Sequence, residues 1–161
     1  MTLTDALHTL IRPTLAELGE PYASPEAECL LLAIGVQESG FLGRVQTHGP
    51  ARGFWQFEIE AVRDFVWHGE EALQLAVSHS GVMLETSVLY TNLAYPQADP
   101  AACILARDLL WRGSLSPLPA LEDVEEGWFQ YLHAWRPGAS KIPAHRRWLR
   151  SHALALTTMR G

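Results

Sequence analysis

Helical periodicity runs through almost the whole of this sequence. Apolar residues recur three and four positions apart, few stretches alternate between apolar and polar residues, and no internal repeat is visible. Such spacing gathers apolar side chains on one face of each helix and leaves no set of strands from which a sheet could be built. The sequence therefore predicts an all-α fold, or a mainly α fold with a small β-hairpin.

The length of the chain sets the number of domains that we expect. At 161 residues, with 48% of them apolar, it can bury one hydrophobic core but hardly two. We therefore expect residues 1–161 to form a single domain. Cys29 and Cys103 both lie in apolar helical segments, so we expect buried free thiols and no disulfide.

Cap and turn residues divide the chain into helices. Ser24 suits an N-cap and Pro25 suits the first helical position, so a helix is expected from there to about Ser39 or Gly40. A glycine-rich connection with a small hairpin is expected from Gly43 to Phe57. The other helices are expected at Thr4–Leu18 with a kink at Pro13, Glu58–Trp67, Glu71–Ser78, Val82–Leu93, Pro100–Arg112, Asp123–Trp135 and Ala144–Thr158.

Charge and hydropathy exclude some classes of partner. The formal net charge of −6 disfavours a general electrostatic grip on nucleic acid. The longest apolar run, Cys29 to Val36, is too short to span a bilayer, and no cleavable leader is visible at the N-terminus. A basic cluster near the end is expected on a solvated helix face, with an anionic partner as the alternative; it consists of Arg136, Lys141, Arg146, Arg147 and Arg150.

Glu38 is the residue that least fits its surroundings. It continues an apolar stripe that is otherwise expected to face the core and contains Ala27, Leu31, Ile34 and Phe41. Partial burial and the nearby negative end of the helix dipole should both raise the pKa of this carboxyl, as a general acid requires. The alternative is that the helix ends before Glu38, whose side chain then points into water.

Two motifs give Glu38 a context. Glu38-Ser39-Gly40-Phe41 is followed after a glycine-rich loop by Gly53-Phe54-Trp55-Gln56, at a separation that resembles the lysozyme-like superfamily of soluble lytic transglycosylases and goose-type lysozymes. In that family a Glu-Ser-x-Phe signature precedes a Gly-Leu-Met-Gln turn that lines the sugar cleft. The segment Ala134-Trp135-Arg136-Pro137-Gly138 resembles the family's Ala-Tyr-Asn-Ala-Gly segment in part, with Arg136 in place of the asparagine.

The resemblance implies a lysozyme-like domain that cleaves the β-1,4 bond between N-acetylmuramic acid and N-acetylglucosamine in peptidoglycan. Glu38 would protonate the leaving oxygen. Ser39 would orient Glu38 or a substrate group, or merely end the helix. The other residues expected to bind substrate are Gly53, Phe54, Trp55, Gln56, Tyr131, Trp135 and Arg136, while Trp67, Trp111, Trp128 and Trp148 are expected in the core.

A hydrolase of the inverting type would also need a second carboxylate to activate water. Glu58, Glu60 and Asp64 are the candidates, although each also suits the first turns of a helix. No cofactor or metal is expected, because neither a His-Glu-x-x-His motif nor paired cysteine spacing is present.

Delivery and partners follow from the same resemblance. In its small size and its lack of a visible leader, the chain resembles phage-encoded members of the family. We therefore expect a protein that is made in the cytoplasm and delivered to the periplasmic cell wall by a phage or another export route. Its partners would be peptidoglycan glycan strands and phage virion or tail proteins. The alternative function is a catalytically weak or inactive lysozyme-fold component that binds glycan within a virion.

Overall fold

The computed structural model describes residues 1–113, 117–136 and 141–161. Over this part of the chain the secondary structure is mainly helical, which confirms the all-α prediction. The expected hairpin is reduced to two isolated β-bridges, Val45 with Arg52 and Arg52 with Phe57. Nowhere in the described ranges is a helix both long and apolar enough to cross a bilayer.

The N-terminal helix is continuous but changes its winding. It consists of α1 (Leu3–Asp5), a π-helical segment η1 (Ala6–Ile11) and α2 (Arg12–Leu18). Thr2 and Asp5 form a capping box at its start. The π-helical segment ends at Ile11, two residues before Pro13, where the sequence predicts a kink; proline has no N–H to donate and its ring crowds the preceding turn.

The central helix α3 (Pro25–Glu38) begins where the sequence predicts. The Ser24 hydroxyl accepts a hydrogen bond from the backbone N–H of Ala27 at 3.1 Å, and the glutamates of the first turn complement the helix dipole. The residues from Cys29 to Gly35 are buried all round the helix, because other elements cover every side of it.

Five of the later helices follow the expected order. They are α4 (Ile59–His68), α5 (Glu71–His79), α7 (Asp99–Gly113), α8 (Val124–Trp135) and α9 (Lys141–Arg160), with a 3-10 turn η2 (Pro96–Ala98) before α7. The helix predicted at Val82–Leu93 is shorter: α6 covers Thr86–Asn92. Glu85 starts it, because its carboxylate accepts from the backbone N–H groups of Ser87 and Val88 and so acts as the N-cap.

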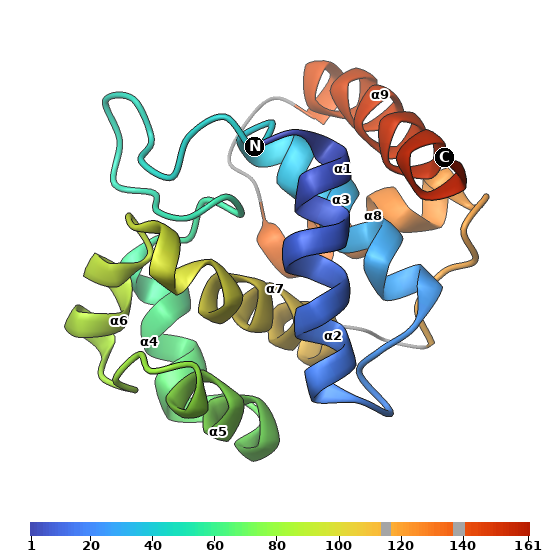
Figure 1. The fold of residues 1–161 in the computed structure, drawn as a ribbon. Helices are drawn as coiled ribbons and strands as arrows, with labels where there is room; N and C mark the ends of the chain where they lie inside the picture. Colours follow the sequence, from blue (N-terminus) through green and yellow to red (C-terminus); the bar gives the residue numbers. More distant parts are fainter. Residues whose placement is uncertain (114–116, 137–140) are drawn as a thin grey trace.

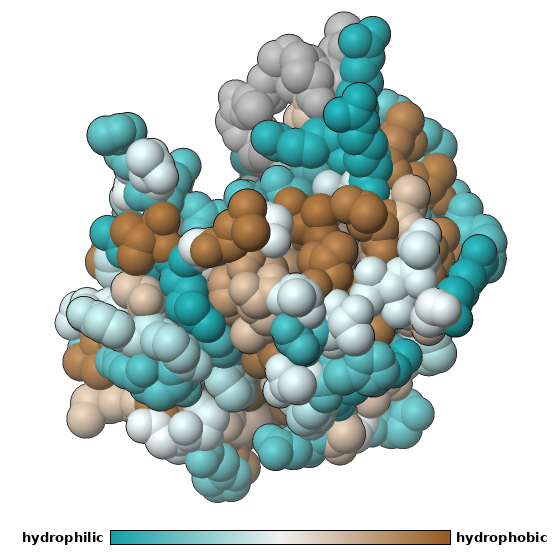
Figure 2. Space-filling view, turned by 45° about the horizontal axis from the view of Figure 1, so that its top comes forward, coloured by the Kyte–Doolittle hydropathy of each residue, from teal (hydrophilic) through white to brown (hydrophobic). Residues whose placement is uncertain are grey.

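The helices group on either side of α7 (Figure 1). On one side lie α4, α5 and α6; on the other lie α3, α8 and α9, with α9 packed along α3. The N-terminal helix crosses α7, and the connection before α4 extends outward as a long loop (Figure 1). Figure 2 turns the top of the molecule in Figure 1 toward the reader. On this face apolar side chains form a band, and groups of hydrophilic side chains project above the band.

The core contains some of the aromatic residues predicted for it. Trp128 and Trp148 are buried, but Trp67 and Trp111 are 74% and 36% exposed, so the prediction for these two is wrong. Trp67 lies near the end of α4 on the side turned to solvent, which the helical spacing alone did not reveal. Cys29 and Cys103 are buried free thiols, as predicted.

Candidate active site

Glu38 is the last residue of α3 and its carboxyl is half-buried. The hydroxyl of Tyr131, on α8, donates a hydrogen bond to Oε1 of Glu38 at 2.5 Å. Burial raises the pKa of Glu38, while the hydrogen bond from Tyr131 and the charge of Arg147 act in the opposite direction. The effect of burial is the larger, which confirms the predicted direction, and the alternative of a carboxylate pointing freely into water is wrong.

Tyr131 is itself held firmly. Its ring is 1% exposed and stacks on Trp148 of α9, with the ring centroids 5.3 Å apart and the planes inclined by 11°. Trp135 lies one turn further along α8, with its centroid 6.3 Å from that of Tyr131. Burial and the charge of Glu38 raise the pKa of Tyr131, so its hydroxyl stays protonated and serves Glu38 as a donor.

Ser39 ties the end of α3 to the loop that follows. Its hydroxyl donates to the carbonyl oxygen of Phe54 at 2.7 Å and accepts from the backbone N–H of Phe41 at 3.1 Å. Both partners are backbone groups of the connection between α3 and α4. Ser39 therefore has a structural role in this arrangement and sets the position of the turn relative to Glu38.

The turn from Gly53 to Gln56 forms as a tight element. Gly53 has φ of +75°, a backbone conformation in which any other residue would be strained, and it packs in ordinary contact with Leu93 and Ala102. Gln56 has φ of +53°, and its side-chain amide donates to the carbonyl oxygen of Gly53 at 2.8 Å. The side chain of Gln56 is thereby fixed at the wall of a cleft, as the sequence predicts for a substrate-binding residue.

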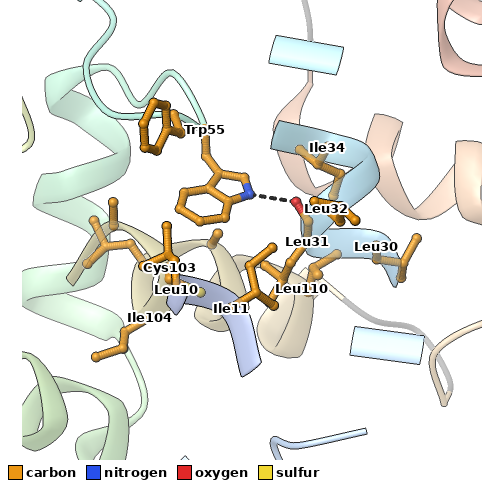
Figure 3. Close-up of a cluster of buried hydrophobic side chains, with 14 of the residues drawn as sticks. Leu10, Ile11, Leu30, Leu31, Leu32, Ile34, Trp55, Cys103, Ile104 and Leu110 are labelled. Carbon is orange, nitrogen blue, oxygen red and sulfur yellow. Dashed lines mark hydrogen bonds between the residues drawn. The ribbon is translucent and has the colours of Figure 1, made fainter. Parts of the chain in front are cut away.

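Phe54 and Trp55 point into the core instead. They are 1% and 0% exposed, and the indole N–H of Trp55 donates to the carbonyl oxygen of Leu31 at 2.9 Å (Figure 3). The prediction that these two rings offer flat faces to a sugar is therefore wrong. Their position follows from packing: Phe41 lies 5.1 Å from Phe54 and 5.8 Å from Trp55, centroid to centroid, which closes the core beneath the turn.

A cleft of about 600 Å³ runs past Glu38. The structure brings to it five of the predicted residues, namely Glu38, Gln56, Tyr131, Trp135 and Arg136. The backbone of the turn is also connected to the cleft wall, because the indole N–H of Trp135 donates to the carbonyl oxygen of Trp55 at 3.0 Å. The volume lies in the range of small-ligand sites.

The candidate second carboxylates separate into two groups. Glu58 and Glu60, at the start of α4, line the cleft and are exposed. Asp64 lies one turn further along α4 and forms an ion pair with Arg112 at 2.8 Å, outside the residues that line the cleft. Only Glu58 and Glu60 are therefore placed to contact a molecule in the cleft.

Arg136 follows α8 in the left-handed conformation, with φ of +46° and ψ of +50°, and its side chain is exposed. Its backbone N–H still bonds to the carbonyl oxygen of Leu132, so this residue ends the helix. Pro137 and Gly138, the last residues of the third motif, lie outside the described residues. The side chain of Lys141 lies outside them as well.

Gln37 and Arg147 are among the cleft residues that the sequence-based set lacks. Gln37 is 3% exposed; its amide donates to the carbonyl oxygen of Ala144 at 3.2 Å and its Oε1 accepts from the hydroxyl of Ser151 at 3.1 Å, which fixes α3 to α9. A polar residue within an apolar helix was the available signal for it. Arg147, on α9, lines the cleft, and nothing in the sequence distinguishes it from Arg146 or Arg150.

The charges on the two walls of the cleft differ. The α4 wall carries Glu58 and Glu60, and the wall formed by α8 and α9 carries Arg136 and Arg147. Within the described ranges, no three His, Cys, Asp or Glu side chains come together as a metal site would need. The arrangement offers a protonatable carboxyl, an amide and charged groups to a polar ligand.

Comparison with protein-family models, with curated proteins and with solved structures finds no match for this chain. What the cleft can do therefore follows from its own residues.

Proposed function

We propose that this protein cleaves the β-1,4 glycosidic bond between N-acetylmuramic acid and N-acetylglucosamine in peptidoglycan, as a lysozyme-like lytic transglycosylase or muramidase. The observation that carries the proposal is the half-buried carboxyl of Glu38 at the wall of the cleft, with its pKa raised by burial and its Oε1 bonded to Tyr131. A carboxyl whose pKa is raised keeps its proton to higher pH than a free glutamate does, and it can donate that proton to a glycosidic oxygen.

The reaction begins with proton transfer from Glu38 to the leaving glycosidic oxygen, as the carbon–oxygen bond breaks. The charge that appears on Glu38 is then stabilised by the Tyr131 hydroxyl, which already donates to Oε1. The carboxylate can next accept a proton from the group that attacks the anomeric carbon. Attack by the muramyl 6-hydroxyl gives a 1,6-anhydro product, and attack by water gives a reducing end.

The rest of the cleft suits a chain of N-acetylated sugars. The amide of Gln56 is fixed within hydrogen-bonding reach of a ligand in the cleft, and Trp135 contributes a partly exposed aromatic ring. Amide groups and aromatic faces are the groups that recognise N-acetyl substituents and pyranose rings. Glu58 and Glu60 are the carboxylates that could activate water if the enzyme hydrolyses its substrate.

The test is mass spectrometry of the soluble fragments that the wild type and Glu38→Gln release from purified peptidoglycan. Glutamine keeps the shape of the side chain but has no proton to transfer, so we expect fragments from the wild type only. Glu71→Gln, which changes an exposed glutamate of α5, is the matched control and should retain full activity. Equal release by wild type and Glu38→Gln would refute the proposal.

The products also distinguish the two reactions. Anhydro-muramyl ends would identify a lytic transglycosylase, and reducing muramyl ends a hydrolase. Binding to peptidoglycan without release of fragments by the wild type would replace the proposal with a glycan-binding role in a larger assembly, such as a phage virion. Delivery to the cell wall by a phage or another export route belongs to the same proposal.

A further inference from the structure

Arg136 and Arg147 are the starting point. Several other arginines are used in internal contacts: Arg12 pairs with Glu28, Arg44 with Asp99 and Arg112 with Asp108. The side chains of Arg136 and Arg147 have neither an ion pair nor a hydrogen bond within the described part of the chain, yet both line the cleft beside Glu38.

Their position is fixed although their side chains are exposed. Arg147 precedes Trp148, which is fully buried and stacks on Tyr131. Arg136 follows Trp135, whose indole bonds to the backbone of the glycine turn at 3.0 Å. Each arginine is thus adjacent in the chain to an anchored tryptophan, and the charge of Arg147 is close enough to lower the pKa of Glu38.

We propose that Arg136 and Arg147 bind a carboxylate on the side arm of the muramic acid residue, so that the cleft selects acidic, muramyl-containing strands over neutral N-acetylglucosamine oligomers. This inference rests on the proposed function. Guanidinium groups pair with carboxylates through parallel N–H···O bonds, and they keep their charge throughout the physiological pH range. Glu58 and Glu60 line the same cleft and would repel this carboxylate, which restricts it to the part of the cleft near the arginines.

Two groups on peptidoglycan supply such a carboxylate. A strand without peptides ends its side arm in the free lactyl carboxylate, whereas in a peptide-bearing strand that group is an amide and the carboxylates belong to the stem. Three tetrasaccharides separate these sources: N-acetylglucosamine alone, alternating N-acetylglucosamine and muramic acid without peptides, and the same alternating strand with its stems.

The experiment measures the affinity of each tetrasaccharide by calorimetry, in Glu38→Gln protein so that no strand is cut. We expect a carboxylate-bearing strand to bind about fivefold more tightly than the neutral one at low ionic strength, with the preference shrinking as salt is added. Adding Arg147→Gln should remove most of this preference, and Arg136→Gln should reduce it. Arg146→Gln and Arg150→Gln alter exposed arginines of α9 that do not line the cleft, and should leave the preference intact.

Each outcome decides a different point. If both acidic strands bind more tightly than the neutral one, the lactyl carboxylate alone is a sufficient ligand for the arginines. If only the peptide-bearing strand does, the ligand is a carboxylate of the stem peptide. Either result supports the inference. Equal binding of all three strands, or a preference that survives Arg147→Gln and Arg136→Gln together, overturns it while leaving the proposed function standing. Binding of none of the three would reject the proposed function and this inference with it.

Discussion

Replacing Tyr131 with phenylalanine tests how the acid is controlled. The change removes only the hydroxyl that donates to Oε1 of Glu38 at 2.5 Å. The ring remains stacked on Trp148, with the centroids 5.3 Å apart, so the packing around it is kept. We expect the free energy of unfolding to fall by about 1 kcal/mol, the net value of a typical hydrogen bond.

The effect on the reaction depends on the charge of Glu38. A hydrogen bond to a charged group contributes about 1.5–3 kcal/mol, against about 1 kcal/mol between neutral groups. The hydroxyl therefore stabilises the carboxylate, which forms as the proton leaves, by roughly 1 kcal/mol more than it stabilises the acid. Because 1.36 kcal/mol corresponds to a tenfold change in rate, we expect kcat of Tyr131→Phe to fall about fivefold where the wild-type acid is protonated.

The pH profile gives an independent reading of the same bond. The hydrogen bond from Tyr131 lowers the pKa of Glu38 against the effect of burial, so its removal should move the alkaline limb of activity to higher pH. The assay is the rate of fragment release across the acidic and neutral range, with thermal unfolding as the check on folding. An alkaline limb at lower pH would refute the reasoning, and a loss of about a thousandfold or more would mean that the hydroxyl transfers a proton itself.

Two further predictions concern stability. A carboxyl whose pKa is raised on folding contributes stability below its unfolded-state pKa, and this stability is lost as pH rises through its folded-state pKa. As pH rises from acidic to neutral, Glu38→Gln should therefore gain stability relative to the wild type. Urea unfolding that shows no pH-dependent difference between the two proteins would contradict this. Trp55→Phe loses the bond to the Leu31 carbonyl and leaves a cavity, so we expect a cost of about 2 kcal/mol in urea unfolding but retained activity in the folded protein, and a selective loss of activity would restore Trp55 to the substrate site.

Local signals in the sequence were enough for the start of α3 and for the unusual character of Glu38. Ser24 and Pro25 define the helix start through interactions within one turn, so no tertiary information is needed there. The raised pKa of Glu38 likewise follows from its place on an apolar stripe. The start of α6 was missed because Glu85 is an uncommon N-cap, whereas serine, threonine, asparagine and aspartate lead at that position.

The partners of Glu38 were harder to predict, because they come from distant parts of the chain. Tyr131 was expected near the site only from its place beside a weak motif, and its bond to Glu38 joins residues 93 positions apart. Trp55 illustrates the opposite error: its motif position suggested contact with sugar, but its indole N–H finds its partner on α3 and turns the ring inward. Periodicity alone does not decide such a choice, since both orientations suit a loop residue.

The dependence of the site on α9 has a consequence for the timing of its assembly. Gln37, the neighbour of Glu38, is held by backbone and side-chain groups 107 and 114 residues further along the chain. At the usual pace of translation the ribosome needs roughly 5 to 20 seconds to add about a hundred residues. During that interval α3 has already been synthesised, but Ala144 and Ser151, which hold Gln37, and Trp148, which stacks on Tyr131, have not. The cleft geometry around Glu38 is therefore among the last features that a nascent chain acquires.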